Sequence, residues 1–204
     1  GNTDVNDIKF NDGNCGYTTS SYLCSTNDKI GGELGTQTNP AVSCKDLIGK
    51  RPELKTKDAA YWLDPDGVGT GAASYQAWCE MTTDGGGWTL VMKSSGASAT
   101  LAYDSAYWTN TALLNATVVT MTSADAKYSS FLNVPFTEVR AGMKRATTTN
   151  WLTFNYAATS MRAVMNSGNN KLITSTRTAW KALVGSDASL QLNCNRVAFN
   201  NFHG

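Results

Sequence analysis

Two aspartates separated by one residue, Asp64 and Asp66, form a compact acidic pair in this chain. They stand in the tetrapeptide Asp64-Pro65-Asp66-Gly67. Proline fixes φ at the first corner of a turn and glycine accepts a positive φ after it, so the pair is expected in a tight turn. Carboxylates at i and i+2 of a turn can both face a calcium ion. The alternative is that both are plain turn residues, and this choice stays open.

Five cysteines at irregular spacing favour disulfides and an oxidising compartment: Cys15, Cys24, Cys44, Cys79 and Cys194. A zinc site would need Cys-x-x-Cys pairs with a histidine cluster, and the chain has neither. If Cys44 and Cys79 are bonded, they close a loop of roughly 35 residues, which is worth about 3–4 kcal/mol in the chain-entropy model. Cys15 and Cys24 are predicted to form a local disulfide that pins a small loop. The alternative is that one of them bonds a neighbouring subunit.

Three aromatic residues, Tyr103, Tyr107 and Trp108, form a candidate cluster in a polar stretch. Such rings serve either core packing or stacking against a sugar. His203 is the only histidine and lies at the end of the chain, so a Ser/His/acid triad would depend on it alone. No Gly-x-Ser-x-Gly elbow is present, and the cysteines are assigned to disulfides. We therefore expect no enzymatic activity.

The composition excludes several classes of function. Only 16% of the residues are charged and the net charge is +1, which gives no basic field for nucleic acid. The longest uncharged run, residues 105–124, is full of Thr, Ser and Asn and is too polar for a membrane span. Within that run, Asn115-Ala116-Thr117 is an N-glycosylation acceptor if the producer is eukaryotic, although chance alone produces such triplets.

The elements that must position these residues are mostly short strands. Alternating patterns predict strands at residues 61–63, 74–78, 88–93 and 151–156, with the first two paired as a hairpin, and further strands at 138–143 and 191–200. Helical patterns are found at 123–131, with Ser123 as cap, at 161–165 and at 174–184, with Ser175 or Thr176 as cap. Glu80 and Asp84 flank a run of three glycines and are expected to be structural.

Three motifs in residues 43–93 carry a family resemblance. They are Ser43-Cys44-Lys45-Asp46-Leu47, then Tyr61-Trp62-Leu63-Asp64-Pro65, then Cys79-Glu80-Met81 followed by Asp84-Gly85-Gly86-Gly87-Trp88-Thr89-Leu90-Val91. Together they resemble the N-terminal half of the fibrinogen-like superfamily, which includes fibrinogen C-terminal domains, ficolins, intelectins and fibrillar-collagen C-propeptides. The resemblance covers about 50 residues.

The resemblance implies an α+β fibrinogen-like domain with an antiparallel sheet, few short helices, long loops and a Cys44–Cys79 disulfide. Residues 1–40 would be an N-terminal disulfide-pinned extension. Residues 41–204 would be a fibrinogen-like domain lacking its C-terminal part, which otherwise bears the second disulfide. On that view Cys194 either misses a partner that the gene encodes or bonds another chain.

The resemblance also implies candidate ligand sites. In collagen C-propeptides a turn like Asp64–Asp66 binds calcium with a later aspartate, but Gly71, Ala72 and Ala73 stand at the later positions here. In intelectins a histidine near calcium helps to hold a sugar diol, which makes His203 a candidate.

The implied function is extracellular recognition. We expect a secreted or surface-displayed module that binds glycans or acetylated surface groups, with calcium as a candidate cofactor and no membrane span. The alternative is a structural subunit or assembly head of an extracellular filament, pilus or fibre, working as a homo-oligomer.

Overall fold

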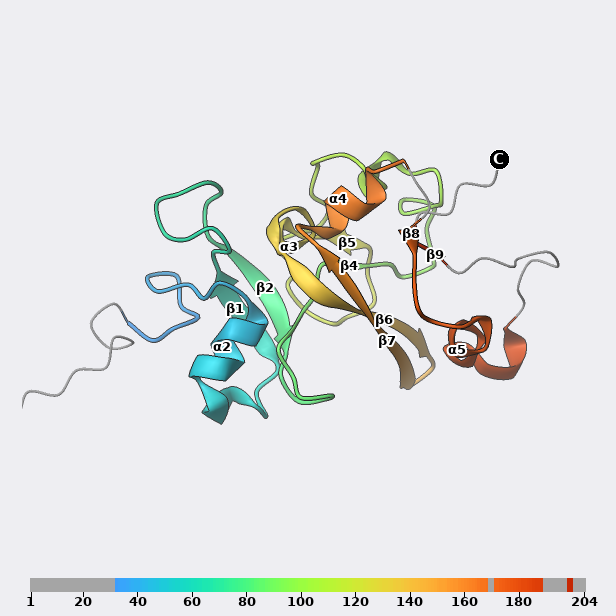
Figure 1. Ribbon diagram of the computed structural model, residues 1–204, viewed down its shortest axis with the longest axis horizontal. Helices are drawn as coiled ribbons and strands as arrows, with labels where there is room; N and C mark the ends of the chain where they lie inside the picture. Colours follow the sequence, from blue (N-terminus) through green and yellow to red (C-terminus); the bar gives the residue numbers. More distant parts are fainter. Residues whose placement is uncertain (1–31, 169–170, 189–197, 200–204) are drawn as a thin grey trace, which may run out of the picture.

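The computed structural model describes residues 32–168, 171–188 and 198–199. They form two packed halves that lie side by side in Figure 1. One half is built on a three-stranded sheet and the other on a long two-stranded hairpin. The sheets are antiparallel and the helices few and short, as expected for the α+β class. Within the described ranges, no helix is long and apolar enough to cross a membrane.

The first half begins with helix α2 (Cys44–Lys50), which the sequence analysis did not predict. The hydroxyl of Ser43 caps it by accepting the backbone N–H of Asp46 at 3.0 Å. Cys44, Leu47 and Ile48 are buried, and their i, i+3, i+4 spacing places them on one face of the helix. A short 3-10 helix, η1 (Pro52–Leu54), follows.

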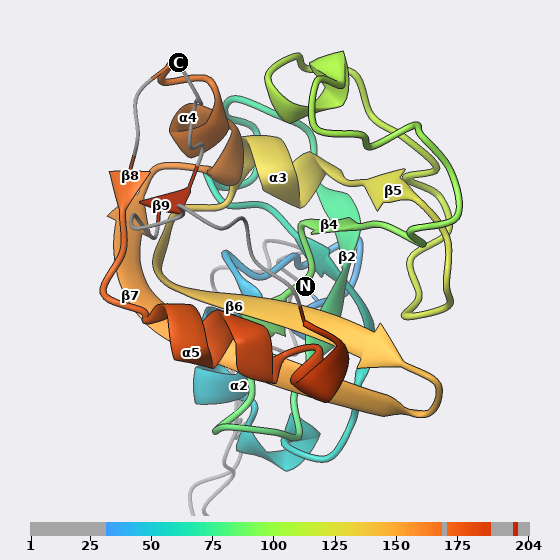
Figure 2. The same ribbon diagram turned by 90° about the vertical axis from the view of Figure 1, so that its right-hand side faces the viewer.

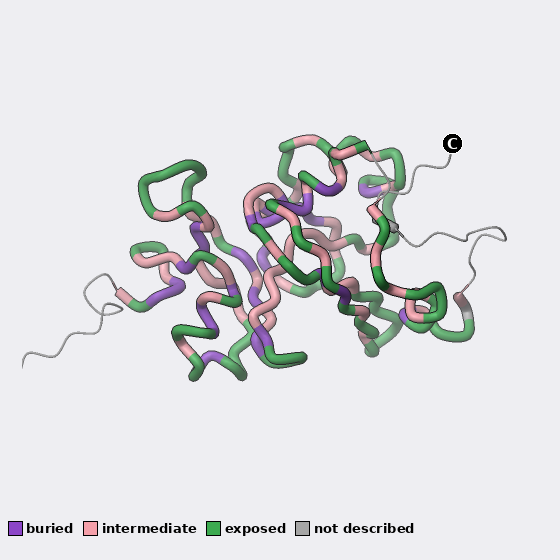
Figure 3. The backbone as a smooth tube through the Cα atoms, in the orientation of Figure 1, coloured by how far each residue is buried: buried purple, intermediate pink, exposed green. Residues whose placement is uncertain are grey.

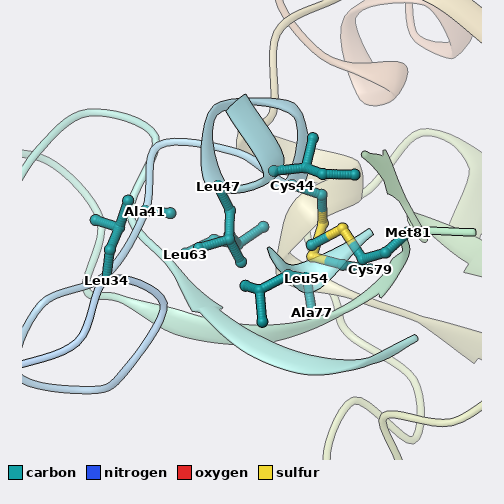
Figure 4. Close-up of a cluster of buried hydrophobic side chains, with 10 residues drawn as sticks. Leu34, Ala41, Cys44, Leu47, Leu54, Leu63, Ala77, Cys79 and Met81 are labelled. Atoms are coloured by element: carbon teal, nitrogen blue, oxygen red, sulfur yellow. A yellow bond between two sulfur atoms is a disulfide. The ribbon is translucent and has the colours of Figure 1, made fainter. Parts of the chain in front are cut away.

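The sheet of this half has the order β1-β2-β3. Strands β1 (Ala59–Leu63) and β2 (Tyr75–Glu80) form the predicted hairpin, with Trp62 opposite Gln76. The short β3 (Trp88–Thr89) pairs with the end of β2. The apolar face of α2 covers this sheet, and Figure 4 shows the resulting core.

A disulfide between Cys44 and Cys79 runs through that core and joins α2 to β2. Both residues are fully buried and their Cα atoms lie 5.5 Å apart. The loop that the bond closes contains both β1 and the Asp64–Asp66 turn. The bond therefore restricts the unfolded chain most strongly around the segment that carries the acidic pair.

The three glycines before β3 let the chain pass close under α2. Gly86 has a φ of +65°, and a Cβ there would lie 2.2 Å from the carbonyl oxygen of Met81. A Cβ on Gly87 would lie 2.9 Å from the Cα of Lys45 in α2. Because neither position has room for a side chain, the glycines are required for the packing of this turn against the helix.

The second half contains the hairpin β6 (Phe136–Arg145) and β7 (Thr148–Ala158), together with α4 (Met161–Met165) and α5 (Arg177–Ala182). Figure 2 shows α5 lying across the hairpin. One face of the hairpin, including Val139 and Phe154, meets these helices, and the ring of Phe154 lies 6.1 Å from that of Trp180. Two further pairs of short strands complete the sheets: β4 (Met92–Lys93) pairs with β5 (Ala126–Lys127), and β8 (Lys171–Leu172) pairs with β9 (Ala198–Phe199). The other short helices are η2 (Ala106–Trp108), α3 (Ser129–Asn133) and η3 (Gly185–Asp187).

Arg140 on the other face of the hairpin connects the two halves. Its guanidinium lies 2.8 Å from Glu80 Oε2 and 2.9 Å from Asp84 Oδ2, the two acids that flank the glycine turn. The same group lies 4.2 Å from the ring centre of Trp151 and 5.4 Å from that of Trp88. Two ion pairs and the cation–π contact with Trp88 thus hold the hairpin against the first half, while Trp151 belongs to the hairpin itself.

Several expected elements differ from those observed. The expected strand 88–93 is divided into β3 and β4, which belong to different sheets, because Met92 pairs with Lys127 instead of continuing along β2. The expected helix at 123–131 is wrong: β5 occupies part of it, and α3 begins only at Ser129. The helix expected at 174–184 is the shorter α5, capped by Thr176. Of the expected strand 191–200, only β9 lies within the described residues.

The expected strands 138–143 and 151–156 are confirmed as the inner parts of β6 and β7, and the helical turn 161–165 is confirmed as α4. In a hairpin with one buried face, apolar and polar residues alternate along each strand, so this part of the fold could be predicted from the sequence.

We predict that Arg140→Met lowers the free energy of unfolding by about 3 kcal/mol, because it leaves the partly buried Glu80 without its cation. Urea denaturation measures this change. Lys144→Ala is the matched control, since Lys144 is an exposed cation of the same strand, and it should change stability by less than about 0.5 kcal/mol. Equal effects of the two variants would contradict the bridging role of Arg140.

Candidate functional site

The Asp64–Asp66 turn projects from the end of β1, and its tip is exposed in Figure 3. Asp64 is only 5% exposed, and its N–H donates to the carbonyl of Ala41 at 2.8 Å. Asp66 is exposed and accepts the N–H of Ala72 at 2.8 Å. A Cβ on Gly71 would lie 1.5 Å from Asp66 Oδ2, so only glycine fits beside this carboxylate. The loop therefore folds back around Asp66.

The two carboxyl groups of this turn differ in their electrostatics. Burial, followed by the hydrogen bond and charge of Asp66, raises the pKa of Asp64 above its ordinary value. The N–H of Ala72 is the main cause that lowers the pKa of Asp66. The Oδ1 atom of Asp64 and the hydroxyl of Tyr75 are both buried, and neither has a hydrogen-bond partner among the described residues. Burial and the nearby aspartates also raise the pKa of Tyr75.

These features match part of a calcium site. An orphaned carboxylate oxygen and a second carboxylate two residues away are the oxygen ligands that calcium prefers. The described residues contain no group of three acidic, histidine or cysteine side chains that could hold a metal. Asp64 and Asp66 would therefore be the protein's carboxylate ligands, and backbone carbonyls or water would have to complete the six to eight oxygens typical of calcium.

A second candidate region is the long loop of residues 94–125, which leaves the β4–β5 pair and returns to it. Asp104 and Asp125 are its two charged residues, and Ser, Thr, Asn and aromatic residues supply most of its polar groups. Figure 2 shows it spreading outward beyond β4 and β5. A polar loop of this length with few charged residues needs fixed contacts at its base to keep one conformation.

Three cations outside the loop provide such contacts by donating to its backbone carbonyls. Lys93 donates to Thr120 and Thr122 at 2.7 and 2.8 Å. Lys127 is completely buried and donates to the carbonyl of Asn110 at 2.8 Å. The third contact runs from Arg162 Nε to the carbonyl of Thr109 at 2.9 Å. Burial lowers the pKa of both lysines, so carbonyl oxygens replace the water that their ammonium groups lose.

Asp125 fixes the first turn of the same loop. Its Oδ1 accepts the N–H of Ser95 at 2.7 Å and the hydroxyls of Ser94 and Ser95 at 3.3 and 3.0 Å, and its Oδ2 accepts the hydroxyl of Ser98. These bonds, that of Ser98 foremost, lower the pKa of Asp125. The charged form of Asp125 is therefore the form that holds residues 94–98 in place.

The structure separates the three aromatic residues of the predicted cluster. Tyr103 is 73% exposed, whereas Tyr107 and Trp108 are half-buried in η2. The indole N–H of Trp108 donates to the carbonyl of Ala102 at 2.8 Å, and the Tyr107 ring lies 6.0 Å from the ammonium of Lys127. Tyr107 and Trp108 thus serve the internal packing of the loop, and Tyr103 presents its ring to solvent.

The loop and the acidic turn are separate regions. In Figure 1 the turn after β1 lies at the far side of the sheet from the loop around η2. Other predicted site residues lie outside the described residues: Cys15, Cys24, Cys194 and His203.

The sequence analysis missed Arg140, Lys93, Lys127 and Asp125. Their partners lie 17 to 60 residues away, so no local motif marks them.

Comparison with known proteins places this sequence in a family. The model of the fibrillar collagen C-terminal domain matches residues 18–122, which is 105 of the 204 residues. The chain belongs to the fibrillar collagen C-terminal domain family. The match includes the Cys44–Cys79 disulfide, the Asp64–Asp66 turn and most of the 94–125 loop. The wider kinship to fibrinogens, ficolins and intelectins stays a prediction.

Curated relatives of this collagen C-terminal domain include both collagens and a lectin. The sequence is 35% identical over 69 residues to the alpha-1(XXIV) collagen of Homo sapiens and to an alpha-1(XXVII) collagen of Danio rerio. It is 32% identical over 102 residues to echinolectin 1 of Echinometra lucunter. These matches span 34%, 34% and 50% of this protein, but 4%, 4% and 41% of the relatives. No solved structure matches significantly. The relatives indicate an extracellular module.

We predict that acidification releases the first turn of the 94–125 loop. Because the folded pKa of Asp125 lies below its unfolded value of about 3.9, its contribution is present above that pH and is lost as the pH falls through the lower folded pKa. The NMR shift of the Ser95 amide should follow this titration. Asp125→Asn should remove the titration and give the released shift at neutral pH. A titrating Ser95 amide in that variant would contradict the assignment.

Proposed function

We propose that this collagen-type domain is an extracellular recognition module that binds glycans or acetylated surface groups through its 94–125 loop. The observation that carries the proposal is the structure of that loop: a hydroxyl-rich segment with only two charged residues, whose base is fixed by cations of the surrounding scaffold. Binding residues are often found on loops that a rigid scaffold positions. Similarity to a protein named as a lectin over half of the sequence supports the same conclusion.

The chemistry of the loop suits an uncharged, polyhydroxylated ligand. Its hydroxyl and amide groups can donate and accept hydrogen bonds, and its only charged residues are Asp104 and Asp125. Asp125 already accepts four hydrogen bonds from the loop itself. Tyr103 offers an exposed ring face of the kind that stacks on the apolar face of a sugar. We assign the domain no enzymatic activity.

Calcium is the proposed cofactor, held at Asp64 and Asp66. A bound cation would satisfy Asp64 Oδ1 and offset the repulsion between the two carboxylates. Because the protein supplies two carboxylates, we expect weak binding, in the range of about 10⁻⁴–10⁻³ M that is typical of extracellular modules. This cation would order the turn and would not contact a ligand bound at the 94–125 loop, since the two regions lie apart.

The second candidate function is assembly, either as the head of a fibre-forming chain or as a subunit of a filament. The family match and the two collagen relatives favour it. Sedimentation of the purified protein distinguishes the two functions. A monomer that binds glycans supports recognition, and a stable oligomer without glycan affinity supports assembly.

We predict that Tyr103→Ala weakens the binding of a glycan selected on a glycan array about tenfold, which corresponds to the loss of one stacked ring, about 1.4 kcal/mol. Isothermal titration measures the change. Tyr103→Phe keeps the ring and should bind within about twofold of the wild type. Leu172→Ala, at an exposed apolar residue outside the loop, is the surface control. Unchanged affinity in Tyr103→Ala would exclude this ring from the site.

We predict that calcium at ten times its dissociation constant stabilises the domain by about 1.4 kcal/mol. Thermal unfolding with calcium and with chelator measures this difference. Asp64→Asn should abolish the response, because an amide offers a single, uncharged oxygen ligand. Glu138→Gln, an exposed acid on β6, should keep it. A calcium response that persists in Asp64→Asn would place the cation elsewhere.

A further inference from the structure

The triplet Asn115-Ala116-Thr117 is the one Asn-x-Ser/Thr sequence of the chain. It opens a turn of the 94–125 loop, in which the N–H of Val118 donates to the carbonyl of Asn115 at 3.1 Å. Asn115 has a positive φ of 45°, a conformation that asparagine tolerates better than most residues. Asn115 and Thr117 are both exposed. The folded protein therefore presents the triplet at its surface.

The side-chain amide of Asn115 has one hydrogen in use. Its Nδ2 atom donates to the carbonyl oxygen of Asp125 at 2.9 Å, and a primary amide nitrogen carries two hydrogens. Replacing the second hydrogen by a sugar leaves the first to keep this bond. The folded structure is thus compatible with a glycan on Nδ2, which it would not be if the acceptor were fully buried.

Exposed apolar side chains surround the acceptor in the sequence. Leu113, Val118 and Met121 are 42%, 48% and 41% exposed, although they lie within six residues of Asn115. Large apolar residues exposed together on a loop are unfavourable in water and favour association. A hydrophilic glycan attached between them would cover part of this apolar surface.

We propose that Asn115 is an N-glycosylation site whose glycan shields the apolar residues Leu113, Val118 and Met121. This goes beyond the proposed recognition function and does not depend on it. The donor is a lipid-linked diphosphate oligosaccharide of the secretory pathway. The reaction forms a bond between Asn115 Nδ2 and the anomeric carbon of the oligosaccharide and breaks the bond from that carbon to the diphosphate oxygen. The amide proton leaves, and the lipid diphosphate is the leaving group.

The test is to produce the full protein in the secretory pathway of cultured animal cells and measure its intact mass. Both secreted and cell-retained protein are analysed, so that poor secretion does not hide the result. We expect a mass above the 21.8 kDa of the polypeptide, restored to that value by peptide N-glycosidase, with Asn115 converted to Asp in the peptide map. Wild-type protein at the bare polypeptide mass would overturn the proposal.

Matched variants assign any glycan to this triplet. Thr117→Ser keeps an acceptor hydroxyl and should remain glycosylated, whereas Thr117→Ala should not. Ala116→Pro leaves Asn115 and Thr117 in place but blocks the triplet, and it should also give the bare mass. A glycan that survives in both Thr117→Ala and Ala116→Pro would locate the modification at another residue and refute the assignment.

The shielding role has a separate readout. Enzymatically deglycosylated protein should bind an apolar fluorescent dye about twofold more strongly than the glycosylated form and aggregate at a lower concentration. Adding Val118→Thr and Met121→Thr to the unglycosylated Thr117→Ala variant should reverse both changes. Equal dye binding with and without the glycan would refute the shielding role, even if Asn115 is modified.

Discussion

The guanidinium of Arg140 is the buried charge through which the two halves of the domain are held together. The Arg140 side chain is 5% exposed, and its guanidinium lies 5.4 Å from the ring centre of Trp88 and 4.2 Å from that of Trp151, with Glu80 and Asp84 as its anionic partners. Taking an arginine out of water is costly, and two carboxylates with two aromatic faces offset that cost. Its contacts fix the glycine turn and the β6–β7 hairpin relative to each other, which makes the packing of both halves interdependent.

The Cys44–Cys79 disulfide fixes the position of the glycine turn, as Arg140 fixes the position of the hairpin. Gly86 and Gly87 approach Met81 and Lys45, and the Cys44–Cys79 bond keeps α2 and β2 at the distance that this contact requires. Glu80 is the first acid after Cys79, and its carboxylate also accepts the N–H groups of Thr82 and Thr83. Glu80 and Asp84, which pair with Arg140, are therefore oriented by a turn that the disulfide holds in place.

Local patterns were sufficient for part of this structure. Apolar and polar residues alternate in the strands 138–143 and 151–156 because one face of their hairpin is buried. The turn after β1 is marked by proline and glycine. The break between β3 and β4 is different. Leu90 still donates to Trp78, but Val91 already accepts from Tyr128, so the backbone changes partners within an unbroken alternating pattern. Such a change depends on the position of β5, which only tertiary structure decides.

The candidate site was predicted to a similar extent. The residue types at Asp64 and Asp66 indicated a cation, but nothing local showed that Asp64 is buried and Asp66 exposed. The same holds for Lys127, because a lysine in a polar segment is usually solvated and its burial follows from a loop that folds over it.

The placement of charge links the fold to the proposed recognition of neutral ligands. The cations that hold the 94–125 loop are satisfied by backbone carbonyls, so Lys93 and Lys127 add order without requiring acids within the loop. Had carboxylates of the loop neutralised them, those acids would compete with a ligand's hydroxyls for the loop's donors. Under the proposed function, the hydroxyl and amide groups at the loop surface would then be the principal means of contact with a ligand. A segment of this kind can stay fixed at its base while its surface residues change, which suits a chain that is similar both to collagens and to a protein named as a lectin.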